Sequence, residues 1–144
     1  VTALDPALPA VELDREQIGR LLTNLIDNAI AAVRQRLAEE PGCGAGRVEL
    51  RTLYDAPLRA ARLEVVDDGI GIPSEDRRRV FEPYFSTKPH GTGLGLAIVS
   101  RIVADHRGYV RIPDAVPRGA RVIVELPVAA EGRQPRTRAG EHAA

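Results

Sequence analysis

Two asparagines, Asn24 and Asn28, lie four residues apart in the segment Asn-Leu-Ile-Asp-Asn-Ala. Because a helix turns about 100° per residue, residues four apart lie along the same edge of a helix. The carbonyl oxygen of an amide is a suitable ligand for a hard cation such as Mg²⁺ when phosphate groups supply other ligands. The pair therefore indicates a polar or metal-binding edge, and the alternative is that both amides simply face solvent.

A carboxylate and two glycines follow an apolar run in the segment Val-Val-Asp-Asp-Gly-Ile-Gly, which includes Asp67, Gly69 and Gly71. A carboxylate at the end of a buried strand can accept a hydrogen bond from an exocyclic amine such as that of adenine. The glycines allow the backbone to approach a flat ligand closely. Asp and Gly are also common in ordinary turns, so this segment alone leaves both interpretations open.

A third segment, residues 91–96, reads Gly-Thr-Gly-Leu-Gly-Leu and opens a predicted helix. The first backbone N–H groups of a helix have no partner within it, and the helix dipole favours an anion there. The spacing is not that of a P-loop, because no Lys and Ser or Thr follow the last glycine. It also differs from the dinucleotide-binding turn, which follows a strand directly. By itself, the segment is weak evidence for a phosphate site.

Between the two glycine segments lies a loop that contains Phe81, Tyr84, Phe85 and Lys88. Aromatic side chains on a long loop can anchor a lid or dock a partner, and Lys88 can contact a phosphate. Local packing within the loop is the alternative for Phe81 and Phe85. A loop of more than about 20 residues in a compact domain is either a functional lid or a sign of a wrong element assignment.

The elements that position these segments follow from the periodicity of the apolar residues. Asp14 and Gln17 fit a capping box ahead of apolar residues that recur every three and four positions, which predicts a helix over residues 14–39. Alternating residues predict an antiparallel hairpin of strands at 48–53 and 63–66. The remaining expected elements are an extended segment at 1–13, a short helix at 74–80 capped by Ser74, a helix at 94–106, and strands at 109–112 and 121–126.

The composition limits the kind of protein. A chain of 144 residues suits one domain, which we place at residues 1–128, with residues 129–144 expected to form a disordered tail. Its 20 basic and 20 acidic residues give a net charge of zero, so we expect no nucleic-acid partner and no direct membrane contact. One cysteine excludes an internal disulfide. The sequence shows no export signal, and we expect a cytoplasmic location even if the parent protein is membrane-anchored.

Together and in this order, the four segments resemble those of the ATP-binding catalytic domain of two-component sensor histidine kinases. Residues 24–29 are similar to the N box of that family, 67–71 to its G1 box, 81–85 to its F box and 91–96 to its G2 box. The resemblance extends over about residues 14–127. The amino-acid sequence of the loop and of the glycine-rich segment is similar to that of the nitrogen-regulation group of these kinases.

The resemblance implies the ATP-binding fold that these kinases share with gyrase-, Hsp90- and MutL-type ATPases. This is an α/β two-layer sandwich, in which a mixed sheet of about five strands is covered by about three helices. It also implies ATP and Mg²⁺ as cofactors, and transfer of the γ-phosphate to a histidine on a separate dimerisation domain. A response regulator would then be the partner downstream.

The resemblance further assigns roles to individual residues. Asn28 would hold Mg²⁺, with Asn24 as a second metal or phosphate contact, and Asp67 would recognise the adenine amine. Gly69 and Gly71 would shape the adenine pocket, and residues 74–92 would form a lid. The full set of ATP-binding residues implied in this way is Asn24, Asn28, Asp67, Gly69, Gly71, Ile72, Thr87, Lys88, Gly91, Thr92, Gly93, Leu94, Gly95 and Leu96.

Asn24 also bears on the kind of reaction. In hydrolytic relatives a glutamate occupies this position and activates water, whereas an amide cannot accept a proton. The resemblance therefore favours a kinase over two alternatives, a hydrolytic ATPase of the same superfamily and a non-catalytic nucleotide-binding or docking module. His90, His106 and His142 lack the helix context of an acceptor histidine, so the fragment alone is predicted not to autophosphorylate.

Overall fold

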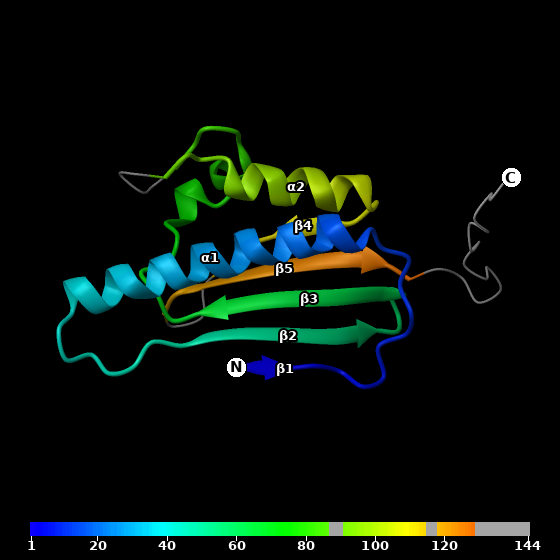
Figure 1. Cartoon of the computed structure of the whole chain (residues 1–144), viewed down its shortest axis with the longest axis horizontal. Coiled ribbons are helices and arrows are strands. Elements are labelled where there is room, and N and C mark those ends of the chain that lie inside the picture. The colour runs from blue at the N-terminus through cyan, green and yellow to red at the C-terminus, as the bar shows by residue number, and fades with distance from the viewer. Residues whose placement is uncertain (87–90, 115–117, 129–144) are drawn as a thin grey trace, which may run out of the picture.

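The computed structural model describes residues 1–86, 91–114 and 118–128 of the chain. Thr87, Lys88, His90, His142 and the expected tail at 129–144 lie outside these residues. Figure 1 shows the α-helices lying over one face of a twisted sheet. The elements are β1 (Thr2–Ala3), α1 (Arg15–Glu39), β2 (Val48–Asp55), β3 (Ala60–Asp67), the 3₁₀ helices η1 (Ser74–Asp76) and η2 (Arg79–Phe81), α2 (Gly95–Asp105), β4 (Tyr109–Arg111) and β5 (Ala120–Pro127).

The sheet has five strands in the order β1-β2-β3-β5-β4. Only β1 and β2 are parallel, and the other neighbours are antiparallel. The expected mixed sheet of an α/β sandwich is therefore confirmed, as is the β2–β3 hairpin. Asp67, the last residue of β3, lies opposite Ala120, the first residue of β5. This register places the end of the hairpin next to a segment from more than 50 residues further along the chain.

The long helix α1 forms as its sequence pattern predicts. The side chain of Asp14 caps it by accepting a hydrogen bond from the backbone N–H of Gln17 at 3.0 Å. Its buried stripe includes Leu21 and Leu25, which are 0% and 2% exposed and pack with Val65 of β3 and Val99 of α2 in the core. Burial of this stripe fixes the rotation of the helix and so orients the adjoining edge, which carries the two asparagines.

The end of α2 is tied to the start of α1 through His106. Its Nε2 atom accepts a hydrogen bond from the backbone N–H of Asp14 at 3.1 Å, and its Nδ1 atom lies 2.8 Å from the carbonyl oxygen of Ile102. An imidazole that accepts at Nε2 and donates at Nδ1 satisfies both contacts in its neutral form. His106 therefore holds the two helices together at the end of the domain that lies away from the glycine-rich segment.

Two expectations about this fold were wrong. The expected helix at 74–80 is a pair of 3₁₀ helices, so the described residues contain two α-helices where about three were expected. Ser74 does not cap a helix, because its hydroxyl donates to Glu75 Oε2 at 3.3 Å and Pro73 holds the N-cap position. The segment buries one apolar anchor, Val80, and a single anchor gives no periodic stripe to support a longer helix.

The expected extended segment at 1–13 pairs with the sheet only at its start. Thr2 and Ala3 form β1 beside β2, whereas residues 10–13 lie in no strand. Val1 contributes two backbone contacts, from its N-terminal amine to Val48 O at 3.0 Å and from its carbonyl to Leu50 N at 2.9 Å. Because these bonds come from the backbone of β2, a side-chain pattern carries no sign of them.

Candidate functional site

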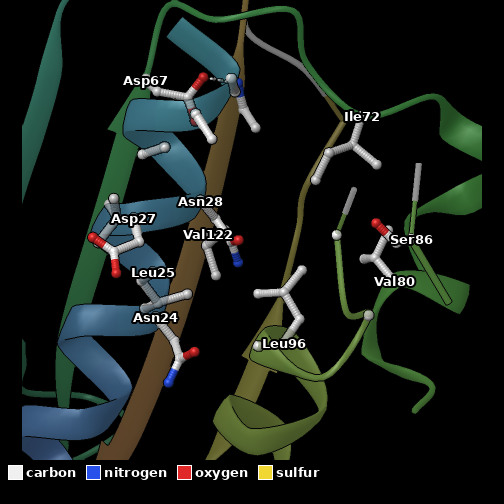
Figure 2. Close-up of a pocket in the computed structure, with 18 of the residues that line it drawn as sticks. Asn24, Leu25, Asp27, Asn28, Asp67, Ile72, Val80, Ser86, Leu96 and Val122 are labelled. Carbon is white, nitrogen blue, oxygen red and sulfur yellow. Dashed lines mark hydrogen bonds between the residues drawn. The ribbon is translucent and has the colours of Figure 1, made fainter. Parts of the chain in front are cut away.

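A pocket of about 490 Å³ opens between α1, the adjoining ends of β3 and β5, and the start of α2. Figure 2 shows side chains from all these elements directed toward one space. The predicted residues that line it are Asn24, Asn28, Asp67, Gly71, Ile72, Gly91, Thr92, Gly93, Leu94, Gly95 and Leu96. The other lining residues are Leu25, Asp27, Ala29, Ala31, Ala32, Val65, Ile70, Val80, Phe85, Ser86, Ile98, Ala120 and Val122. The pocket thus brings together residues of all four sequence segments that could do chemistry, including Phe85 of the aromatic loop.

The carboxylate of Asp67 is fixed at the inner end of this pocket. The residue is 7% exposed, and its Oδ1 atom accepts hydrogen bonds from the backbone N–H groups of Gly69 at 2.8 Å and Ala120 at 3.3 Å. Two backbone donors on one oxygen fix the orientation of the carboxylate. Apolar side chains line the same pocket, including Val65 of its own strand and Val122 of β5. The site therefore offers an oriented acceptor in a mostly apolar cleft.

Three glycines allow the close packing that builds this end of the pocket. A Cβ atom on Gly119 would lie 1.9 Å from the carbonyl oxygen of Asp67, and Gly119 has φ +81°. Gly71 has φ +77°, and a Cβ atom on it would lie 3.0 Å from the carbonyl oxygen of Gly119. Gly69 does not line the pocket: its missing side chain leaves room for α1, whose Ala32 carbonyl carbon would be 2.5 Å from a Cβ. Gly69 therefore shapes the site from behind, by positioning the turn against the helix.

The two aspartates after β3 have different surroundings. Whereas Asp67 lines the pocket, Asp68 does not. Asp68 Oδ1 accepts from the backbone N–H of Arg47 at 2.8 Å, and its Oδ2 pairs with Arg36 at 3.1 Å. Asp68 therefore ties the turn to the segment that leads into β2, and of the two carboxylates only that of Asp67 lies where a ligand in the pocket could contact it.

The amides of Asn24 and Asn28 face the start of α2. Asn24 Nδ2 donates to the carbonyl oxygen of Arg20 at 2.8 Å, which leaves Oδ1 as the end of this amide that faces away from its own helix. A Cβ atom on Gly95 would lie 3.2 Å from Asn24 Oδ1 and 3.6 Å from Asn28 Nδ2. In Figure 2 both side chains lie on the side of α1 that faces Leu96. The amide edge and the glycine-rich helix start thus meet at one place, as the sequence predicted.

The loop before the glycine-rich segment packs against it through backbone contacts. Tyr84 N–H donates to the carbonyl oxygen of Gly93 at 2.9 Å, and a Cβ atom on Gly93 would lie 2.5 Å from the Tyr84 carbonyl carbon. Tyr84 has φ 64° and is 80% exposed, whereas Phe85 lies beneath the Arg79 guanidinium, 4.3 Å from ring centre to Cζ. The expected local packing of the aromatic loop is present for Phe85, which also lines the pocket.

Sequence reasoning missed Asp27 and Gly119. Asp27 is an exposed carboxylate that lies between the two asparagines and lines the pocket. Its position inside the Asn-Leu-Ile-Asp-Asn segment was a usable signal. Gly119 carried no such signal, because its place beside Asp67 depends on the pairing of β3 with β5. No cluster of three or more His, Cys, Asp or Glu side chains suited to a metal occurs in the described part of the chain.

The comparison with protein families identifies the class. Residues 13–130 match the family described as histidine kinase-, DNA gyrase B-, and HSP90-like ATPase. The chain belongs to this family. Within it, the relatives below place the chain with the catalytic domains of sensor histidine kinases.

Two curated relatives are NtrB and NtrY, and the second carries a name from nitrogen regulation, in line with the resemblance. The sensory histidine kinase/phosphatase NtrB of Rhodobacter capsulatus is 38% identical over 136 residues, which cover 87% of this chain and 36% of NtrB. The nitrogen regulation protein NtrY of Azorhizobium caulinodans is 37% identical over 127 residues, 88% of this chain and 16% of NtrY. The chain thus spans about a third or less of these relatives.

Solved histidine kinase structures share the fold. Full-length ShkA in complex with AMPPNP matches with a TM-score of 0.73 and 31% identity, over 90% of this chain and 25% of ShkA. The mycobacterial sensor histidine kinase MprB matches with a TM-score of 0.70 and 36% identity, over 88% of this chain and 79% of that structure.

No helix among the described residues has both the length and the apolar character needed to cross a bilayer.

Proposed function

We propose that residues 1–128 form a catalytic domain that binds ATP with Mg²⁺ in this pocket and transfers its γ-phosphate to a histidine on a separate dimerisation domain. The observation that carries the proposal is the convergence of Asp67, the two amides and the start of α2 on one pocket of about 490 Å³. That volume lies within the range of pockets that hold small ligands and cofactors. The names of the relatives, which are sensor histidine kinases, support the same reaction class.

The inner end of the pocket suits a purine with an exocyclic amine. The fixed carboxylate of Asp67 would accept a hydrogen bond from the adenine amine, and the backbone beside Gly71 lets the flat ring approach closely. Leu25 and Val65, each 2% exposed, give the ring an apolar floor. A hydrogen bond to a charged acceptor contributes about 1.5–3 kcal/mol in such surroundings.

The other end suits phosphates. The first backbone hydrogen bond of α2 runs from Ile98 N–H to the carbonyl oxygen of Leu94 at 2.9 Å, so the N–H groups of the residues between them have no acceptor within the helix. Those groups and the positive end of the helix dipole favour anionic oxygen atoms. Gly95 places no side chain between these groups and the two amides of α1, whereas Gly93 leaves room for the backbone of Tyr84.

The residues present fit a magnesium ion with few protein ligands. Mg²⁺ prefers oxygen donors and is commonly held by one or two protein ligands together with substrate phosphates. Asn28, with Asn24 as a second contact, would supply amide oxygen atoms at the edge of α1 that faces the helix start. When bound, the ion neutralises negative charge on the phosphates. The nearby carboxylate of Asp27 would add negative charge at this edge and so attract the cation.

The same edge favours phosphoryl transfer over hydrolysis. Asn24 occupies the position at which a hydrolytic relative would place a glutamate, and an amide cannot remove a proton from water. Its Nδ2 group is also engaged with the Arg20 carbonyl, which holds the amide in one orientation. Hydrolysis should therefore be slow, and the γ-phosphate is retained for an external acceptor. Asp27 is the carboxylate on which a hydrolytic alternative would have to depend.

The acceptor is proposed to lie outside this chain. His106 is occupied by its contacts with Asp14 and Ile102, at the end of α2 opposite the pocket. The fragment alone is therefore expected not to autophosphorylate. We propose that its partners are the dimerisation domain of the parent kinase and, downstream, a response regulator, and that the domain acts in the cytoplasm.

The test uses γ-labelled ATP and a separately produced helical domain from the parent kinase. The account expects label on the helical domain only when this fragment and Mg²⁺ are both present, and almost none on the fragment itself. Asn28→Ala should remove the transfer while the fragment remains folded by circular dichroism. Strong labelling of the fragment alone, or rapid release of inorganic phosphate that Asp27→Asn abolishes, would contradict the proposal.

A further inference from the structure

The segment of residues 79–86 places an aromatic ring in the wall of the pocket. Phe85 lines the pocket together with Val80, which is 8% exposed and anchors this segment to the domain. Figure 2 shows Val80 and Ser86, from the same segment, on the side of the pocket opposite Asn28. Phe85 itself is only half-buried. A ligand in the pocket would therefore meet this ring from the side opposite α1.

Two backbone turns bring Arg79 over this ring. The N–H of Glu82 donates to the carbonyl oxygen of Arg79 at 2.9 Å, and the N–H of Phe85 donates to that of Glu82 at 3.3 Å. The guanidinium carbon of Arg79 lies 4.3 Å from the centre of the Phe85 ring. A cation within about 6 Å of a ring centre is attracted by the negative charge of the ring face. The segment thus folds back on itself in a way that favours an attractive stack of guanidinium on ring.

The ring, and not a carboxylate, orients the guanidinium of Arg79. Arg77, two residues earlier, pairs with Asp114, whereas Arg79 has no carboxylate partner among the residues that the structure describes. Arg79 is exposed and does not line the pocket, so its guanidinium covers the ring from outside. Arg79 can therefore act on a ligand in the pocket through the ring of Phe85.

The backbone next to the ring is tied to the segment that opens α2. Tyr84 N–H donates to the carbonyl oxygen of Gly93 at 2.9 Å, and Tyr84 has a left-handed φ of 64°. A bulky residue keeps such a φ only where its surroundings fix it. With this backbone held, rotation of the Phe85 side chain is the main freedom left, and the guanidinium restricts it. A side chain that is ordered before binding loses less conformational entropy when a ligand contacts it.

We propose that Arg79 is a positioning residue for nucleotide binding, whose guanidinium holds the Phe85 ring in the pocket wall, where the ring contacts the bound nucleotide. The inference rests on the proposed function, because it takes Mg-ATP as the occupant of the pocket. A cation–π pair at an exposed site changes an equilibrium constant about two- to fivefold. Loss of the stack should therefore weaken the binding of Mg-ATP by about that factor, without any direct contact between Arg79 and the phosphates.

The test is a double-mutant cycle on the dissociation constant of Mg-ATP, measured with this chain by isothermal titration calorimetry. Arg79→Met removes the charge but keeps a long side chain, and it should weaken binding by the stated factor, whereas Arg79→Lys should retain part of the affinity. In a Phe85→Leu background, Arg79→Met should have no further effect, because the ring through which it acts is gone. Arg78→Met is the matched control, since Arg78 is also exposed but stacks on no aromatic ring in the described part of the chain. It should leave the affinity unchanged.

The outcomes separate this role of Arg79 from the proposed function. Unchanged affinity in Arg79→Met would overturn the inference, as would an equal loss in Arg78→Met. A loss that persists in the Phe85→Leu background would also overturn it, because Arg79 would then act without the ring. If Phe85→Leu does not fold, the three arginine variants still decide the matter. A wild type that binds Mg-ATP but shows no coupling contradicts only the role of Arg79, whereas a wild type that does not bind Mg-ATP contradicts the proposed function and this inference together.

Discussion

Replacement of Asp67 by asparagine tests how the pocket would recognise its base. In the structure Asp67 Oδ1 already accepts from the N–H groups of Gly69 and Ala120. The new side chain can keep both bonds with its own Oδ1, but it then presents an NH₂ group where the carboxylate presents an acceptor. The new NH₂ group and the adenine amine would then face each other as two hydrogen-bond donors, with no acceptor between them. The loss of a hydrogen bond to a charged acceptor, about 1.5–3 kcal/mol, corresponds to roughly 10- to 150-fold weaker binding.

The assay compares Mg-ATP with Mg-ITP, whose base carries a carbonyl oxygen in place of the amine. Isothermal titration calorimetry should show the wild type binding ATP more tightly, and Asp67→Asn should weaken ATP by the stated factor. Binding of ITP should stay constant or improve, because the new NH₂ group can donate to its oxygen. Asp68→Asn is the matched control, since Asp68 does not line the pocket. It should leave the ratio of the two affinities unchanged. Equal losses for ATP and ITP in Asp67→Asn would refute this account of base recognition.

Further predictions concern stability. Gly119→Ala should lower the free energy of unfolding by more than about 2 kcal/mol, because its Cβ would lie 1.9 Å from the Asp67 carbonyl oxygen at φ +81°. Gly42 has a similar φ of +86° but open space around it, so urea denaturation should show a smaller loss of stability for Gly42→Ala. Equal losses in the two variants would mean that the positive φ, and not the contact with Asp67, causes the effect. The hydrogen bond from Arg51 lowers the pKa of Glu49 to about 2 despite the opposing effect of burial. Since the folded-state pKa is depressed, Glu49 stabilises the fold above pH 4.5, and this contribution is lost as the pH falls toward 2. Glu49→Gln should flatten the pH dependence of the melting temperature in that window, and an unchanged slope would contradict the assignment.

The part of the site that the sequence predicts is the part encoded by local patterns. Asn24 and Asn28 fall on one helix edge because they are four residues apart. The buried stripe through Leu21 and Leu25 fixes the rotation of α1 and so the direction in which this edge faces. The glycine-rich segment opens α2 within one residue of the expected start. In each case the residues that set the geometry are neighbours in the chain, so periodicity alone is sufficient.

What the sequence could not predict depends on contacts between distant segments. Gly119 and Ala120 reach Asp67 only through the β3–β5 register. Gly69 was expected to shape the pocket, but the sequence could not indicate that it does so from behind the turn, where α1 approaches it. The position of β1 depends on backbone bonds to β2, and Val80 was too isolated to show whether its loop was helical. All of these features depend on tertiary contacts, which either override the local sequence preference or leave no pattern in the neighbouring residues.

The most direct test of the central claim is a crystal structure of this domain with Mg²⁺ and a non-hydrolysable ATP analogue. The account predicts the adenine amine within hydrogen-bond distance, about 3 Å, of the Asp67 carboxylate. It also predicts Mg²⁺ near the amide oxygen of Asn28, and phosphate oxygen atoms at the N–H groups that begin α2. An analogue bound elsewhere, or one in this pocket with its base turned away from Asp67 and its phosphates away from α2, would contradict it.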